Sequence, residues 1–186
     1  MTLPARRPAT YDDLVALPEH LVGEIVGGEL QVSPRPAVPH AVGASALGAT
    51  LLTGMQFGDG GPGGWWILHE PEIHLDENVV VPDIAGWRRD RLPAPPHEGF
   101  LTLAPDWVCE VLSPSTSRFD RTKKLPVYAR ARIPHLWLLD PLNETLETYR
   151  LEGEYWMLLA THGGEDVVRA EPFEVVEIDL KRLWGR

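Results

Sequence analysis

The feature that most constrains the fold is a strand, helix and strand pattern in the middle of the chain. Trp107–Leu112 and His135–Leu139 are apolar runs of strand length, and Ser117–Ala131 between them has a helical pattern. Two strands joined by a helical crossover pair in parallel within one sheet. The pattern therefore predicts an α/β protein with a mixed sheet and flanking helices.

Further elements are expected on both sides of this unit. The order of apolar and turn residues predicts a helix at Tyr11–Leu17, a hairpin at Gly23–Ser33, a helix at His40–Met55, strands at Trp65–Leu75 and Val79–Trp87, and two or three antiparallel strands within 145–183. A chain of 186 residues has the usual size of one domain. We therefore expect a single domain over residues 1–186.

Composition excludes several classes of protein. No apolar run reaches the roughly 18 residues that a membrane span needs, and no hydrophobic stretch follows Arg6 and Arg7 as in a signal peptide. The single cysteine, Cys109, rules out an intrachain disulfide and a cysteine-based zinc site. A cytoplasmic protein without membrane contact is expected.

The charges are unevenly distributed. The net charge of −10 argues against nonspecific binding to nucleic acid, which depends on lysine and arginine. From Leu112 to His135, however, six basic residues accompany one acidic residue. This segment is compatible with a polyanionic substrate, and a solvated amphipathic helix is the alternative interpretation.

Two carboxylates lie in runs that are otherwise apolar. Asp83 follows Val79–Pro82 near the end of one predicted strand, and Glu110 lies in the middle of Trp107–Leu112. An ionised carboxylate among aliphatic side chains is costly unless a cation or hydrogen-bond donors meet it. Oxygen ligands without sulfur favour Mg²⁺ or Mn²⁺. The alternative is that both acids lie at strand ends in solvent or in salt bridges with Arg88, Arg89 or Arg121.

The order and spacing of several motifs resemble the Uma-two family of restriction-endonuclease-like proteins. The matching segments are Glu24–Leu30, Ser33-Pro34, His40, Pro82-Asp83, Glu110–Thr116, the series Asp120, Lys124 and Tyr128, and Trp137–Pro141. The resemblance covers about Tyr11 to Arg150. It implies the PD-(D/E)XK nuclease fold, with Asp83 and Glu110 as metal ligands.

The catalytic lysine departs from the general pattern of that superfamily. Leu112 stands two residues after Glu110, where the superfamily usually has lysine, and leucine cannot orient water. The Uma-two pattern carries its lysine on the following helix, where Lys124 matches. The alternative role for Lys124 is a surface ion pair with Asp120 at i,i+4 spacing. Pro126 inside the same helix is expected to kink it.

Other residues complete the predicted site. Glu24 resembles the acidic residue that such nucleases supply from the N-terminal region, and Glu29 is the competing candidate. The residues expected to bind substrate are Ser113, Ser115, Arg121 and Tyr128, with helix capping as the alternative role of the serines. The His69–His74 segment lacks the spacing of a metal-binding helix. Most of the tryptophans are expected to pack in the core or in a dimer, with base stacking as the alternative.

The function that these residues favour is a Mg²⁺-dependent or Mn²⁺-dependent endonuclease acting on phosphodiester bonds, most simply in DNA. Two alternatives come from other classes of protein. One is a binding module that kept the nuclease fold and lost activity. The other is a homodimer held together by exposed strands or tryptophans, which would not exclude nuclease activity.

Overall fold

The structure is a computed structural model that describes residues 7–18, 20–33 and 36–186. Arg6 and Pro34, which entered the sequence interpretation, lie outside the described residues. The central sheet has the strand order β10-β9-β8-β7-β6-β3. Its strands are β3 (Trp65–His69), β6 (Ile84–Arg88), β7 (Trp107–Val111), β8 (His135–Asp140), β9 (Thr145–Glu152) and β10 (Tyr155–Gly163).

The predicted strand, helix and strand unit is confirmed. β7 and β8 are parallel, with Glu110 opposite Leu138, and the remaining neighbours in this sheet pair antiparallel. The crossover between them contains α3 (Ser117–Phe119), the π-helical segment η2 (Asp120–Lys124) and α4 (Leu125–Arg130). The central sheet is therefore mixed, as the sequence predicts.

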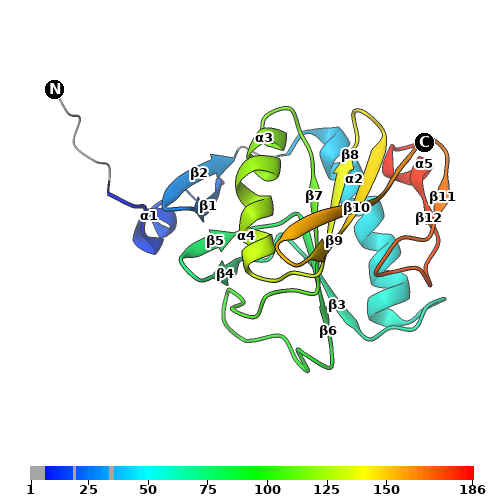
Figure 1. The fold of residues 1–186 in the computed structure, drawn as a ribbon, viewed down its shortest axis with the longest axis horizontal. Helices are drawn as coiled ribbons and strands as arrows, with labels where there is room; N and C mark the ends of the chain where they lie inside the picture. The colour runs from blue at the N-terminus through cyan, green and yellow to red at the C-terminus, as the bar shows by residue number, and fades with distance from the viewer. Residues whose placement is uncertain (1–6, 19, 34–35) are drawn as a thin grey trace.

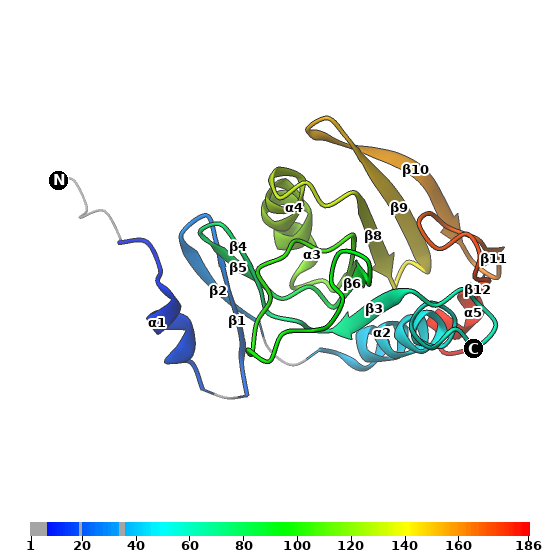
Figure 2. The ribbon, with the colours of Figure 1, turned by 90° about the horizontal axis from the view of Figure 1, so that it is seen from below.

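Helices cover both faces of this sheet (Figures 1 and 2). On one face lies α2 (Val38–Leu51), which continues as the π-helical segment η1 (Leu52–Phe57), and on the other lie α3 and α4. Side chains alternate along β7, so Cys109 packs in the core beneath α2, while Val108 packs in the core beneath α4. The same alternation turns Glu110 towards α4.

A second, smaller sheet lies beside the first and has the order β2-β1-β5-β4. It contains β1 (Val22–Val26), β2 (Glu29–Ser33), β4 (Ile73–Leu75) and β5 (Asn78–Val80), and α1 (Tyr11–Val15) precedes it. The turn between β1 and β2 consists of Gly27 and Gly28, both with positive φ. Two consecutive positive φ values define the tight turn typical of a two-residue hairpin, so this prediction is confirmed.

The two long strands predicted upstream of β7 are wrong as single strands. Trp65–Leu75 breaks into β3 and β4, and Val79–Trp87 breaks into β5 and β6. Each break contains a proline, Pro71 or Pro82, which has no N–H for a sheet ladder. At each break the chain passes from one sheet to the other. Asp83 consequently lies in the connection between the two sheets, one residue before β6.

The crossover helix contains a π turn where the sequence predicts a kink. The Leu125 N–H donates to the carbonyl of Asp120, five residues back. Pro126 follows directly; it has no N–H, and its ring would collide with the carbonyl four residues earlier in a regular helix. The wider turn accommodates the proline, and it keeps both Lys124 and Tyr128 buried against the sheet.

The C-terminal part extends and covers the sheet. β9 and β10 form the expected antiparallel hairpin. Val175 and Val176, which were expected in a strand, lie outside any strand. β11 (Val167–Val168) and β12 (Ile178–Asp179) form a two-stranded sheet before α5 (Leu180–Leu183). Trp107 and Trp137 are fully buried and meet edge to face, which confirms a core role. Among the described residues, no helix is long and apolar enough to cross a membrane.

Candidate active site

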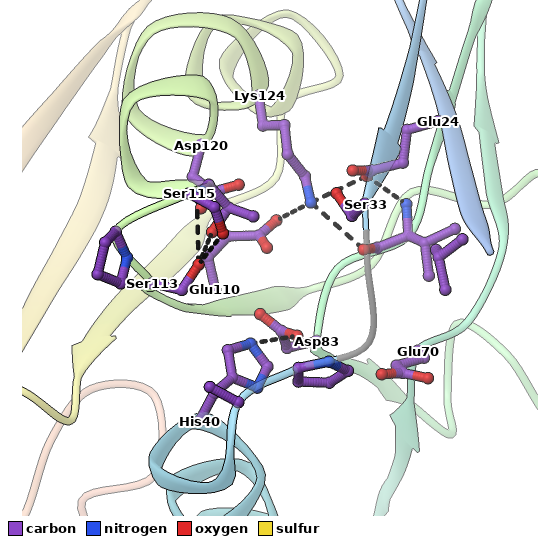
Figure 3. Close-up of a pocket in the computed structure, with 16 residues that line it drawn as sticks. Glu24, Ser33, His40, Glu70, Asp83, Glu110, Ser113, Ser115, Asp120 and Lys124 are labelled. Carbon is purple, nitrogen blue, oxygen red and sulfur yellow. Dashed lines mark hydrogen bonds and ion pairs between the residues drawn. The ribbon is translucent and has the colours of Figure 1, made fainter. Parts of the chain in front are cut away.

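Six of the eight predicted site residues converge on one cavity of about 360 Å³ where the two sheets meet the start of the crossover helix (Figure 3). Its lining comes from β1, β2, β7, α2 and η2, from the β3–β4 and β5–β6 connections, and from the segment that follows β7. Five carboxylate side chains line it, together with one lysine and one histidine: Glu24, Glu70, Asp83, Glu110, Asp120, Lys124 and His40.

Lys124 lies between two of these carboxylates. Its Nζ is 2.8 Å from Glu110 Oε1 and 2.9 Å from Glu24 Oε1, and it donates to the Val81 carbonyl at 3.3 Å. Only 2% of Lys124 and 2% of Glu110 is exposed. The alternative of a surface pair with Asp120 is therefore wrong, because the ammonium is buried and its partners are Glu24 and Glu110.

Burial and neighbouring charges shift the pKa values of this cluster. Burial lowers the pKa of Lys124, but Glu110 and Glu24 oppose it strongly enough to hold the pKa well above its usual value. Burial raises the pKa of Glu110, and the positive charge of Lys124 opposes that rise. Burial also raises the pKa of Asp120 to about 6, against Lys124 and a hydrogen bond with Thr116. The lysine is charged and offsets part of the buried negative charge.

Asp83 is held from the opposite side of the cavity. Its Oδ2 accepts a hydrogen bond from the Val111 N–H at 2.7 Å, and its Oδ1 lies 3.0 Å from His40 Nε2. Burial lowers the pKa of His40, but the hydrogen bond and charge of Asp83 outweigh it and raise the value overall. Asp83 therefore has a fixed orientation, with a backbone donor on one oxygen and an imidazole on the other.

Comparison with known proteins identifies the family and the fold of the chain. The family model Uma2, described as "Putative restriction endonuclease", matches residues 9–181. The chain belongs to this family. A solved structure described as "a putative nuclease" from Anabaena variabilis superposes with a TM-score of 0.77 at 22% identity, covering 96% of this chain and 98% of that chain. No curated protein matches. The structural match shows that the chain and this putative nuclease share a fold with a mixed sheet.

The structure distinguishes between the two candidate glutamates of the Uma2 N-terminal signature. Glu24 is buried in β1, lines the cavity, accepts a hydrogen bond from the Val81 N–H at 2.7 Å and pairs with Lys124. Glu29 is exposed, outside the cavity, with its Oε2 3.6 Å from Lys123 Nζ. The two differ because β1 turns Glu24 towards the crossover helix, whereas Glu29 begins the next strand after the turn.

Two of the predicted substrate-binding residues of this Uma2 chain lie elsewhere. Arg121 is outside the cavity lining and makes a two-point ion pair with Glu147 on β9, with both distances 2.9 Å. Tyr128 is fully buried behind the cavity wall and donates to Glu110 Oε1. Both predictions are corrected for the same reason: successive turns of the helix direct side chains to β9 and into the core as well as to the cavity.

The serines lie where the sequence places them. Ser113 and Ser115 line the cavity and share a hydrogen bond between their hydroxyl groups at 3.0 Å. Ser113 Oγ also accepts from the Thr116 N–H, at 3.3 Å. Ser113 thus makes a capping contact, whereas Thr116, the N-cap of α3, makes no side-chain capping bond.

Sequence reasoning missed three titratable residues that line the site, His40, Glu70 and Asp120. His40 could have been found from the sequence, because it belongs to the N-terminal motif of the family resemblance. Its partner Asp83, however, is 43 residues away in the sequence. Glu70 lies at the break between β3 and β4 with a φ of 45°. Only the break in the predicted strand brings it to the cavity.

Proposed function

We propose that this chain is a metal-dependent nuclease that hydrolyses phosphodiester bonds in DNA, with Mg²⁺ or Mn²⁺ as cofactor. The observation that carries the proposal is the convergence of Asp83 and Glu110, from separate elements, on one cavity with a buried lysine against Glu110. The family description supports nuclease chemistry, and its reference to restriction enzymes supports DNA as the substrate.

The donor set of the cavity fits a hard divalent cation. Of the described residues that line it, five are carboxylates and Lys124 alone is a lysine or arginine, so these groups would repel an anionic phosphodiester without a further cation. Within the described residues, no three His, Cys, Asp or Glu side chains form a ready-made ligand cluster. Mg²⁺ is typically bound by one or two carboxylates, and waters and substrate oxygens complete its coordination shell.

In this proposal Asp83 and Glu110 hold the ion. When bound, a divalent cation polarises a phosphate oxygen and makes a coordinated water more acidic. The chain's own contribution is orientation: His40 and the Val111 N–H fix Asp83, and Lys124 fixes Glu110. Glu24 anchors the lysine from the other side of the cavity.

Lys124 is also the proposed catalytic group. An ammonium has three N–H donors, and here they meet Glu24, Glu110 and the Val81 carbonyl. The contact to the carbonyl is the longest of the three, at 3.3 Å. A substrate phosphate oxygen would replace that contact, and the ammonium would then stabilise the negative charge that develops as the phosphorus is attacked. Ser113 and Ser115 would offer hydroxyl donors to the same phosphate.

The decisive experiment combines metal titration with a cleavage assay. We expect the native chain to bind Mn²⁺ in calorimetric titration and to nick plasmid DNA in its presence. Asp83→Ala should lose both properties, while Asp90→Ala, an exposed aspartate outside the cavity, should keep them. A native chain that neither binds Mn²⁺ nor cleaves DNA would refute the proposal and favour an inactive binding module.

A further inference from the structure

We propose that Tyr128 is a positioning residue that makes the two carboxylate oxygens of Glu110 inequivalent, and that Oε2 is the oxygen presented to the divalent cation. This inference rests on the proposed function. It also changes the interpretation of Tyr128, which the sequence placed among the substrate-binding residues.

The contacts of Glu110 carry the inference. Tyr128 is completely buried in α4, and its hydroxyl donates to Glu110 Oε1 at 2.5 Å. Lys124, one turn earlier, approaches the same oxygen at 2.8 Å. Both protein donors therefore converge on Oε1, while Oε2 receives no hydrogen bond from the part of the chain that the structure describes. Figure 3 shows the carboxylate reaching into the cavity beside Lys124.

Rotation of the Glu110 carboxylate is restricted by this arrangement. A rotation that exchanged the two oxygens would break one hydrogen bond with a buried hydroxyl and one with a buried ammonium. Hydrogen bonds to an ionised carboxylate are stronger than those between neutral groups, so the observed orientation is preferred. The free oxygen is consequently fixed towards the cavity that Asp83 also lines.

A tyrosine is well suited to this task. Its phenolic hydroxyl supplies one O–H donor at the end of a rigid ring. It adds no charge to a cavity wall that already contains a buried lysine. Because Tyr128 does not line the cavity, it acts through Glu110 and makes no contact with substrate.

The chain provides a matched pair of variants for the test. Tyr128→Phe removes the hydroxyl that contacts Glu110. Tyr149→Phe removes a hydroxyl that donates to Glu147 Oε2 at the same distance of 2.5 Å, away from the cavity. Loss of a group that orients a metal ligand lowers metal affinity by about 10–100-fold. We expect Tyr128→Phe to raise the Kd for Mn²⁺ by that factor, and Tyr149→Phe to leave it unchanged.

The outcomes separate this inference from the proposed function. Mn²⁺ binding by the native chain with an unchanged Kd in Tyr128→Phe would overturn the positioning role alone, whereas no Mn²⁺ binding by the native chain would overturn both. If Tyr128→Phe does not fold, a crystal structure of the native chain with Mn²⁺ gives the answer. Metal on Oε2 with the Tyr128 hydroxyl still on Oε1 supports the inference, and metal on Oε1 with the hydroxyl displaced refutes it.

Discussion

Lys124 shows how burial changes the meaning of a charged residue. An exposed lysine paired with one acid contributes less than about 1 kcal/mol, and Lys123 beside Glu29 is such a case. Lys124 has the same chemistry, but its ammonium is enclosed by Glu24, Glu110 and a backbone carbonyl. Its removal would leave two buried carboxylates without their counter-charge, and such a loss is costly.

We therefore expect Lys124→Ala to reduce both stability and turnover. Breaking a buried ion pair by removing one partner costs about 3–5 kcal/mol, which chemical denaturation would measure. At saturating Mn²⁺ and at a temperature where the variant remains folded, turnover should fall by about two orders of magnitude or more. Lys123→Ala is the control and should change neither quantity appreciably. Native turnover in folded Lys124→Ala would remove this lysine from the mechanism.

His40 gives a second prediction at the scale of the residue. Its Nε2 meets Asp83 Oδ1, and a glutamine side chain can place an N–H donor close to the same position. His40→Ala should weaken Mn²⁺ binding by about tenfold or more, because Asp83 loses one of its two orienting contacts. His40→Gln should recover much of the loss, as calorimetric titration would show. Equal weakening by both substitutions would indicate that His40 matters through packing and not through its donor.

At the scale of the element, the crossover helix shows what the sequence can and cannot predict. The alternation along Trp107–Leu112 places Glu110 correctly, and the position of Lys124 on the next helix follows from the family pattern. The burial of Tyr128 behind the cavity wall does not follow, because it depends on how the helix packs against the sheet. Pro126 signals an irregularity, but its form depends on packing against the sheet.

The breaks in the two long predicted strands could likewise be predicted only in part. Pro71 and Pro82 are visible as ladder breakers, yet the apolar residues around them fit a continuous strand equally well. Whether the chain continues or changes sheets depends on pairing with distant segments, such as Ile25 with Val79. Glu70 reaches the site only through such a change of sheet, and His40 reaches it through the packing of α2 against the central sheet. They were missed because their partners are distant in the sequence.

The buried carboxyl of Asp120, which begins the π turn, predicts a pH effect. Burial raises its pKa from 3.8 to about 6 in the folded chain. A carboxyl whose folded pKa exceeds its unfolded value stabilises the fold fully below the unfolded pKa, and this contribution is lost as the pH rises through the folded pKa. Asp120→Asn lacks this titration. Between pH 4 and pH 6.5, the free energy of unfolding of the native chain should fall relative to that of Asp120→Asn. Urea denaturation across this pH range would measure the difference. Parallel pH profiles of the two proteins would contradict the prediction.

At the scale of the whole molecule, the basic residues of the crossover segment do not gather at the cavity. Of the basic residues between Leu112 and His135, only Lys124 lines the cavity. Arg121 is paired with Glu147, and Lys123 faces Glu29 on the small sheet. The net charge of the whole chain is −10. Lysine and arginine contacts alone therefore offer little attraction for a nucleic acid at this site.

This distribution predicts that DNA binding depends on a divalent cation. With Ca²⁺, which has the same preference for oxygen ligands, the native chain should retain a labelled DNA duplex, and chelation of the metal should release it. Asp83→Ala should bind weakly under both conditions, because it lacks a carboxylate that holds the ion. Because the described lining contains one lysine and no arginine, the affinity measured in Ca²⁺ should also fall only modestly between 50 and 200 mM salt, since few counterions are released. Tight binding in chelator with a steep salt dependence would instead locate the DNA on a basic surface away from the five carboxylates.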